Sequence, residues 1–132
     1  MRLWHYKLIS VLPNKMLVSQ WRELIAIKRQ WEKGTLKHKL VSYVMDSDKS
    51  LFNNYVLRVC YELHKRNIKY QEKFYIEIAQ FCDLTITDTN YKEHNDKYFK
   101  QCYYNLEEKH DRGIISDEEW ELIEDEVGKE VK

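Results

Sequence analysis

Glycine and proline are scarce in this sequence, which contains three Gly and one Pro among 132 residues. Sheets whose strands are joined by tight turns need more of both, because those turns demand positive φ angles or a fixed φ. The same scarcity excludes a glycine-rich phosphate-binding loop. We therefore predict an all-α protein, a compact single-domain helical bundle of about five to six helices that extends over residues 1–132.

Cysteine pairs and metal-binding patterns are also missing. Cys60, Cys82 and Cys102 are scattered and form no Cys-x-x-Cys pair. We expect free thiols that fill the core of a protein in a reducing cytoplasm. The five His show neither a His-x-x-x-His pair nor cysteines at ligand spacing, so we expect no metal and no cofactor. The absence of a Gly-x-Ser-x-Gly sequence disfavours ordinary hydrolases.

Long hydrophobic runs are absent as well, and charged residues make up 33% of the chain. We therefore expect no membrane-spanning segment. The first seven residues include Arg2 and Lys7 and lack the apolar stretch of a signal peptide. A cytoplasmic protein that does not bind membranes is the expectation from these absences.

The net charge of zero conceals an asymmetry. Residues 1–80 contain 15 Lys and Arg against 7 Asp and Glu, whereas residues 81–132 contain 7 against 15. One interpretation is a basic body that binds a polyanion and an acidic end that repels it. The other is that the acidic end folds onto the basic part and neutralises it. The composition gives the two interpretations similar weight.

What the sequence does contain is helical periodicity. Apolar residues at helical spacing, together with residues typical of helix ends, define the predicted helices. These cover residues 13–34, 36–45, 51–66, 71–82, 95–111 and a last helix that begins after Ser116. Residues 46–50 are expected to form a turn that supplies N-caps, and residues 84–90 a loop, because an isolated strand has no partner. Residues 128–132 are expected to fray.

Several of these boundaries rest on local chemistry. Gly34 is a typical residue for the left-handed position after a helix, and Asn67 is a plausible one. Ser116 and Glu119 have the spacing of a capping box, in which each side chain binds the other's backbone N–H.

The first long helix contains the most interesting charged pair. Leu17, Trp21, Leu24, Lys28 and Trp31 follow the 4-3-4-3 spacing of an inward face. The carboxylate at position 23 lies about 100° from Leu24, so it can border this face and point towards a cleft. The residue types alone favour a solvated ion pair between positions 22 and 23, since most neighbouring Arg and Glu are of that kind. Adjacent helical residues face each other poorly, so a shared catalytic role needs a third group.

A basic cluster surrounds the end of this helix and offers candidate contacts for phosphate groups. A solvated surface is an equally good explanation for it. The candidate DNA-binding residues are Arg2, Lys28, Arg29, Lys33, Lys37, His38 and Lys39.

Aromatic residues near the start of the chain have two explanations. Trp4, His5 and Tyr6 can line a pocket and stack on a base, but aromatic residues near a terminus more often anchor the core. His94, at the start of a predicted helix, is expected to belong to the cap region rather than to act as an acid or base.

Five short runs resemble one known family. They are Leu-Ile-Ser at 8–10, Met-Leu at 16–17, Gln-Trp-Arg-Glu-Leu at 20–24, Gln-Cys-Tyr-Tyr-Asn-Leu at 101–106 and Leu-Glu-Glu-Lys at 106–109. They match the pyrimidine-dimer DNA glycosylases of phages and viruses, also called endonuclease V. The chain is most similar to the bacterial branch, whose members also begin Met-Arg-Leu-Trp-His.

The resemblance implies a small helical DNA-repair enzyme, a glycosylase and AP lyase that acts without metal on damaged pyrimidines in duplex DNA. Its partner would be duplex DNA with a damaged or abasic site, and the protein would be a monomer. The family's N-terminal amine, here that of Met1, attacks C1′ of the nucleoside, and β-elimination from the resulting imine nicks the strand. Glu23 corresponds to the carboxylate that stabilises the cationic intermediate, and Arg22 to the arginine that contacts the DNA backbone near the lesion.

The chain departs from the characterised enzymes of the family at position 2. Those enzymes have a small second residue, so that removal of the initiator methionine exposes the reactive amine, whereas this chain has Arg2. An amine on a retained Met1 is about 3.5 Å out of register. Either Met1 folds back, or Lys7 replaces it as nucleophile, or the chemistry differs or is absent. The alternatives are a non-catalytic member that binds nucleic acid or protein, and an N-glycosidase for another nucleoside.

Overall fold

The computed structural model of the protein describes residues 1–131, and within that range its regular elements are all helices. They are the 3₁₀-helix η1 (Tyr6–Val11), α1 (Asn14–Lys33), the 3₁₀-helix η2 (Lys39–Val41), α2 (Ser42–Met45), α3 (Lys49–Lys65), α4 (Glu72–Phe81), α5 (Asp96–Asp111) and α6 (Asp117–Val131). The all-α prediction and the expected number of α-helices are confirmed.

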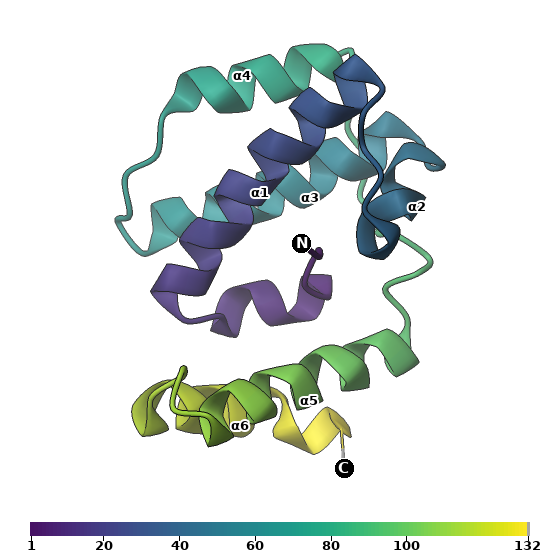
Figure 1. The fold of residues 1–132 in the computed structure, drawn as a ribbon. Helices are drawn as coiled ribbons and strands as arrows, with labels where there is room; N and C mark the ends of the chain where they lie inside the picture. Colours follow the sequence, from purple (N-terminus) through teal and green to yellow (C-terminus); the bar gives the residue numbers. More distant parts are fainter. Residues whose placement is uncertain (132) are drawn as a thin grey trace.

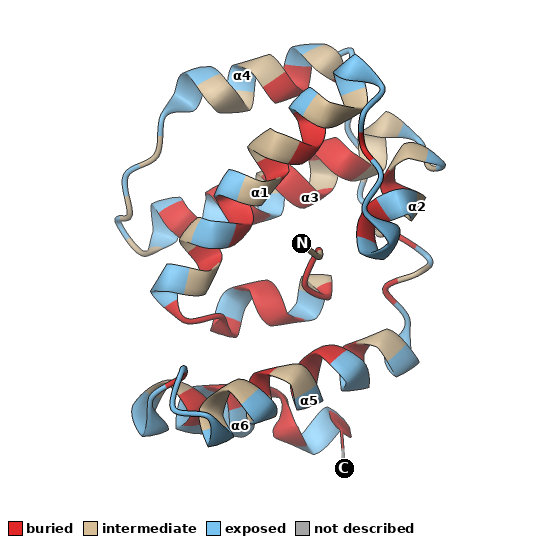
Figure 2. Ribbon diagram, viewed as in Figure 1, coloured by how far each residue is buried: buried red, intermediate tan, exposed pale blue. Residues whose placement is uncertain are grey.

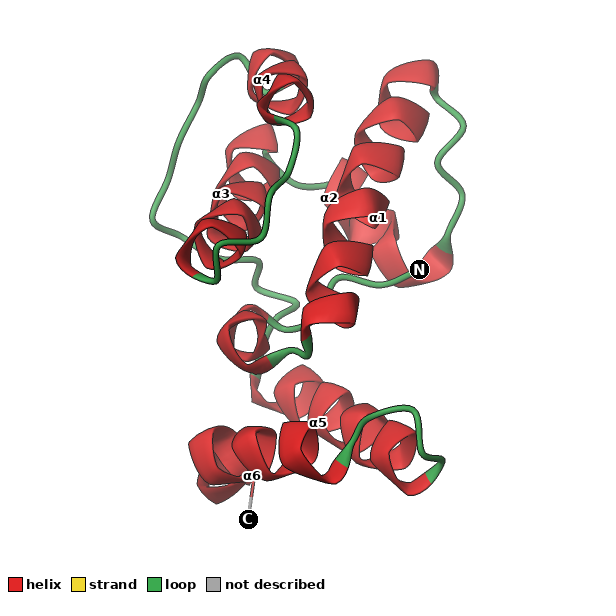
Figure 3. Cartoon of the chain, turned by 90° about the vertical axis from the view of Figure 1, so that its left-hand side faces the viewer, coloured by secondary structure: helices red, strands yellow, loops and turns green. Residues whose placement is uncertain are grey.

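The helices form two groups that meet at η1. In the first group α1, α3 and α4 pack against one another, and the short α2 lies against α3 (Figure 1). In the second group α5 and α6 pack as a pair (Figures 1 and 3). The 3₁₀-helix η1 contacts α3 on one side and both α5 and α6 on the other. The N-terminal segment therefore occupies the centre of the fold.

One hydrophobic core connects both groups. It includes fully buried side chains from different layers: Leu8 of η1, Leu24 of α1, Phe52 of α3, Leu106 of α5 and Ile123 of α6. Figure 2 shows the buried residues on the faces of α1, α3 and η1 that look towards each other. Burial of this continuous apolar surface is the main force that holds the fold together.

The predicted helix ends are present. Gly34 has a φ of 72° after α1, and Asn67 has a φ of 58° after α3. The Ser116 N–H donates to Glu119 Oε1 at 3.0 Å, and the Glu119 N–H donates to Ser116 Oγ at 3.1 Å, so the capping box of α6 is formed. These ends were predictable because each depends on residues only a few positions apart.

The prediction of one helix over residues 36–45 is wrong. Residues 36–38 are not helical, and only η2 and α2 are helical in this stretch. Leu36 and Val41 are both buried, whereas Leu40 is 54% exposed. In a continuous helix Leu36 and Val41 would lie about 140° apart and could not both face the core. Non-helical backbone before η2 allows both to be buried.

The prediction of a frayed C-terminus is also wrong for residues 128–131, which continue α6. Ile123, Val127 and Val131 follow one another at a spacing of four and are all buried. They form an apolar face on a helix that packs against η1 and α5. Lys132 lies outside the described residues.

The three cysteines are buried and unbonded, as predicted. Burial raises the pKa of the Cys60 thiol to about 12 and that of Cys82 to about 11. Both therefore remain protonated core residues at neutral pH. Among residues 1–131, none of the helices combines the length and hydrophobicity that crossing a bilayer requires.

Candidate functional site

The start of the chain is buried without belonging to a helix or strand. Residues 1–5 form no regular element, yet Leu3, Trp4 and His5 are buried. Buried backbone N–H and C=O groups must be paired, and here the partners are side chains.

Gln20 of α1 provides the central pair of these bonds. Its Nε2 donates to the Arg2 carbonyl at 3.0 Å, and its Oε1 accepts the Trp4 N–H at 2.8 Å. Gln20 is only 1% exposed. The hydroxyl of Tyr55 on α3 lies 2.6 Å from the Trp4 carbonyl and 3.0 Å from Gln20 Oε1. This Gln20 clamp holds the first residues against the middle of α1, where the N-terminus lies in Figures 1 and 3.

Further bonds from α5 and the loop before it complete the arrangement. The Tyr98 hydroxyl donates to the Leu3 carbonyl, and the Tyr6 N–H donates to His94 Nδ1 at 3.3 Å. Because Nδ1 accepts this bond, the neutral ring carries its proton on Nε2, which lies 2.8 Å from the Tyr43 hydroxyl. Burial lowers the pKa of His94 to about 3. A buried, neutral His94 is a structural residue rather than an acid or base at neutral pH.

Glu23 lies one turn beyond the Gln20 clamp. Three residues along a helix correspond to about 4.5 Å along its axis and about 60° around it. The Glu23 side chain is half-buried, and Met1 is half-buried as well. Within residues 1–131, Glu23 has no cationic group within the 4.0 Å of an ion pair, in contrast to Glu32, Glu62 and Glu77. The structure thus holds the backbone of Arg2 and Trp4 one helical turn before Glu23 along α1.

Arg22 points to another side of α1 and forms no ion pair with Glu23 in the described part of the chain. Its exposed side chain lines a hollow of about 230 Å³ together with Trp21, Tyr70 and Phe74. The solvated pair that the residue types favour is therefore not present.

A separate hollow of about 390 Å³ lies beside Arg2. It is lined by Arg2, Leu40, Tyr98 and Tyr104, among others, and Glu23 is not part of its lining. The Arg2 guanidinium carbon lies 5.4 Å from the centroid of the Trp4 ring, a cation–π distance. The structure therefore opens to solvent next to the clamped segment, on the side of α5.

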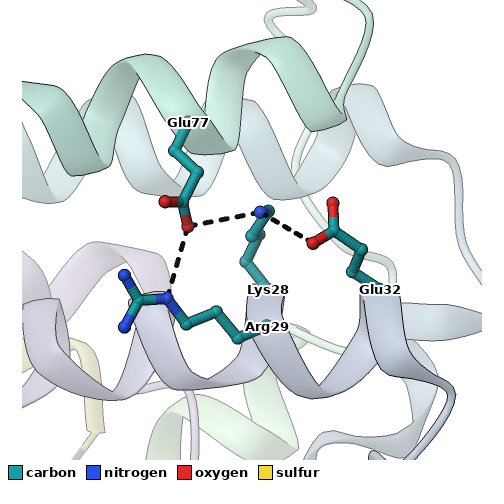
Figure 4. A network of polar contacts seen from close by, with 4 residues as sticks. All are labelled: Lys28, Arg29, Glu32 and Glu77. Atoms are coloured by element: carbon teal, nitrogen blue, oxygen red, sulfur yellow. Dashed lines mark hydrogen bonds and ion pairs between the residues drawn. The ribbon is translucent and has the colours of Figure 1, made fainter.

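The predicted basic cluster is divided into two parts. Lys28 Nζ lies 3.2 Å from both Glu32 Oε1 and Glu77 Oε2, and Arg29 Nε lies 3.4 Å from the same Glu77 oxygen (Figure 4). The Lys28 side chain is only 5% exposed. Although burial alone raises the pKa of Glu77, hydrogen bonds from Lys28 and Arg29 hold it below its ordinary value. These two cations join α1 to α4.

The other part remains at the surface. Lys33, Lys37, His38 and Lys39 are exposed, and within residues 1–131 none of them forms an ion pair. The next residue, Leu40, lines the hollow beside Arg2. A basic surface thus runs from the end of α1 towards the clamped segment.

The aromatic residues near the start are mainly core residues, as expected. Trp4 and His5 are buried, and Tyr6 is half-buried. Lys7 is exposed, lies 3.8 Å from Glu130 of α6, and shares a hollow with residues of α5. Lys7 therefore lies next to the α5–α6 pair. Arg22 lies in different surroundings, because it faces the loop before α4.

Sequence reasoning missed the role of Gln20 and of the tyrosines that bind the same segment. A usable pattern existed for Gln20, because Leu17, Gln20, Leu24 and Ile27 follow helical spacing and Gln20 is the polar member of that buried face. A polar side chain on an apolar face needs a hydrogen-bond partner. Tyr55 and Tyr98 also lie at helical spacing on the inward faces of α3 and α5, but that spacing does not identify the partners of their hydroxyls. In the described part of the chain, no group of three or more side chains is arranged to hold a metal.

The fold and the site define an all-helical domain whose N-terminal segment is clamped to its first long helix beside a carboxylate. The family model for pyrimidine dimer DNA glycosylase matches residues 1–76, which is more than half of the chain. The chain belongs to this family. The matched region includes η1, α1, α2 and α3, and therefore contains the Gln20 clamp, Arg22 and Glu23. Comparison with curated proteins and with solved structures finds no match.

Proposed function

We propose that the protein is a DNA repair glycosylase with AP lyase activity, acting on damaged pyrimidines in duplex DNA. The observation that carries this proposal is the Gln20 clamp, which binds the backbone of Arg2 and Trp4 to α1 one helical turn before Glu23, within the family-matched region. A half-buried carboxylate that forms no ion pair within residues 1–131, one helical turn from the residue that binds the first part of the chain, suits chemistry in which an amine becomes a cation.

The proposed reaction uses the α-amine of Met1 as nucleophile. An α-amine loses its proton more readily than a lysine side chain and is therefore the better nucleophile near neutral pH. It attacks C1′, the glycosidic bond breaks with its electron pair on the departing base, and opening of the sugar ring gives an imine. Loss of a C2′ proton then expels the 3′ phosphate and nicks the strand. Glu23 assists ring opening and stabilises the iminium cation.

DNA contacts in this proposal come from the exposed basic residues after α1 and from the half-buried Arg2. Arg2, Lys33, Lys37, His38 and Lys39 bind phosphates along the surface that leads to the clamped segment. The guanidinium of Arg29 remains half exposed and stays in this set, and Arg22 contacts the backbone near the lesion. The buried Lys28 ammonium is assigned to packing between α1 and α4.

Borohydride trapping on duplex DNA with one abasic site tests the proposal. The wild-type chain is expected to form a covalent adduct, and Glu23→Gln to lower its rate about 100-fold or more, as loss of a charge-stabilising group does. Glu32→Gln is the matched control on the same helix and is expected to retain the adduct.

Two measurements identify the amine. Intact mass establishes whether Met1 is retained, and peptide mapping of the adduct is expected to find the sugar on Met1, with Lys7→Gln still reactive. An adduct on Lys7 contradicts the assignment of the nucleophile. If the chain forms no adduct but still binds DNA in a salt-sensitive way, the proposed enzymatic activity is contradicted, and a DNA-binding, non-catalytic member of the family is the better explanation.

A further inference from the structure

Three adjoining hollows surround Tyr70, where α3, the following loop and α4 meet. The first, of about 320 Å³, is lined by Cys60, Tyr61, His64, Tyr70 and Tyr75, among others. The second, of about 400 Å³, shares His64 and Tyr70 with it and includes Lys69. The third shares Lys69 and Tyr70 and ends at Arg22. Together they form what we call the Tyr70 groove, whose lining contains none of residues 1–5.

Aromatic rings form the walls of this groove. Tyr61 is 68% exposed, while Tyr70 and Tyr75 are half-buried. The Tyr70 ring is fixed by an edge-to-face contact with Trp21, with centroids 5.4 Å apart and planes at 67°. Fixed aromatic rings beside an open groove present flat, apolar faces on which another flat ring can stack.

Basic residues outnumber acidic ones in and around the groove, whose lining includes Lys69 and Arg22 together with one acid, Glu72. Residues 57–76 contain five Lys and Arg against two Asp and Glu. The ion pair between Glu62 and Arg66, at 2.8 Å, neutralises one charge of each sign. Lys65, Lys69 and Lys73 are exposed, and none of them forms an ion pair in the described part of the chain. This charge complements a polyanion.

We propose that the Tyr70 groove binds single-stranded DNA. Bases stack on Tyr61, Tyr70 and Tyr75, while the phosphates lie along the exposed lysines. Aromatic rings combined with a basic groove are the means by which proteins bind single strands without reading their sequence. A duplex keeps the faces of its bases inside the stack, so the tyrosines could not reach them. The site goes beyond the proposed action on duplex DNA and does not depend on the amine or on Glu23.

Fluorescence anisotropy of a labelled dT12 oligonucleotide with the full chain tests this inference. Tyr61→Ala is expected to weaken binding about 10-fold or more, because each stacked base contributes substantially to affinity. The matched control is Tyr104→Ala, which alters a tyrosine that is 52% exposed on α5, outside the groove. A dodecamer of tetrahydrofuran sugar phosphates, which carry no base and cannot form an imine, is expected to bind the wild-type chain at least as weakly as dT12 binds Tyr61→Ala.

Equal affinity of wild type and Tyr61→Ala for dT12 overturns the proposal, as does an equal loss in Tyr104→Ala. Absence of dT12 binding by the wild-type chain also overturns it and leaves the groove to a protein partner. Tyr61→Ala is expected to nick abasic duplex DNA at the wild-type rate. If the wild-type chain binds dT12 but does not nick abasic duplex DNA, that result contradicts only the proposed repair activity.

Discussion

At the scale of single residues, the buried amide of Gln20 determines where the chain begins in space. Its two polar atoms bind the backbone on either side of Leu3. A buried polar side chain stabilises a fold only when it is paired, and then it favours one arrangement over others. Gln20 therefore couples the position of the first residues to that of α1.

Replacement of Gln20 by alanine is expected to lower the free energy of unfolding by about 2 kcal/mol, because the Trp4 N–H and the Arg2 carbonyl lose their partners in the interior. Urea denaturation measures this change. Gln30→Ala, at a half-buried position of the same helix, is the control and is expected to have a much smaller effect. The rate of borohydride trapping by Gln20→Ala is also expected to fall, and by more than the loss of folded protein accounts for. Equal unfolding curves for the two variants contradict the role of the clamp.

The burial of His94 predicts a pH dependence of stability. The unfolded chain protonates this imidazole below its ordinary pKa of 6.5, whereas the folded chain does so only near a pKa of about 3. The contribution of His94 to stability is therefore constant above pH 6.5. It falls by about 1.4 kcal/mol per pH unit as the pH decreases from there towards 3.

Urea titrations between pH 7 and pH 4 measure this slope. In His94→Gln the residue no longer titrates but retains hydrogen-bonding groups, so the slope is expected to become smaller. Some slope remains, since burial also lowers the pKa of His5. An unchanged slope in His94→Gln contradicts the prediction.

At the scale of elements, α1 and α4 are joined by the charges that Figure 4 shows around Glu77. Glu77→Gln is expected to destabilise the protein by about 1–3 kcal/mol at pH 7, because it leaves the buried Lys28 ammonium with one exposed partner. The double variant Lys28→Met/Glu77→Gln is expected to recover much of this loss, since it removes the buried charge as well. Glu32→Gln changes only an exposed pair and is expected to cost less than about 1 kcal/mol.

The pH dependence of this effect follows from the lowered pKa of Glu77. Stability from the ionised carboxylate is fully present above the ordinary pKa of 4.5 and is lost as the pH falls through the lower, folded value. The difference between wild type and Glu77→Gln is therefore expected to disappear in acid. A difference that persists at low pH contradicts this origin.

Helix ends and helix interiors were predictable from the sequence to different degrees. Gly34 and the Ser116–Glu119 capping box act through neighbours in the chain, so the pattern was sufficient. The region before Val41 depends on how Leu36 reaches a core built by distant residues, which no local pattern contains. Two sequence features gave opposite predictions for Lys28. Its place on the inward face of the helix predicted burial, whereas its charge suggested phosphate binding. Helical spacing was the better guide to its environment.

At the scale of the whole molecule, the charge asymmetry is a separation in space. The acidic α6 packs mainly against α5 and η1. Within residues 1–131, the single ion pair between the basic first 80 residues and the acidic remainder is Lys7–Glu130. The interpretation in which the acidic end neutralises the basic part is therefore not supported. A polyanion would meet opposite fields at the two ends of the molecule.

The exposed basic surface predicts a salt dependence of binding to undamaged duplex DNA. Replacing Lys37 and Lys39 by glutamine is expected to weaken binding and to reduce the slope of log affinity against log salt by about 2, roughly 0.9 for each lost phosphate contact. Anisotropy between about 50 and 200 mM salt measures this slope. The same replacements at Lys97 and Lys129, on α5 and α6, are the controls and are expected to leave it unchanged. Identical slopes for all variants contradict the assigned surface.

The candidate site was accessible from the sequence only in part. Glu23 was singled out from its place at the border of an apolar face and from the family resemblance, and its catalytic role remains a prediction. The bonds that bring the chain start to α1 link residues that are 16 or more positions apart, such as Trp4 and Gln20. Contacts of that range depend on the assembled core, so the sequence pattern could not supply them.

The position of the chain start beside α1 has a practical consequence for recombinant samples. Residues added ahead of Met1, such as an affinity tag, must emerge next to α1 (Figures 1 and 3). A tag there occupies the space around the terminus and converts its amine into an amide. Purification by a carboxyl-terminal tag, or by one whose cleavage leaves Met1 first, avoids mistaking a blocked sample for an inactive protein.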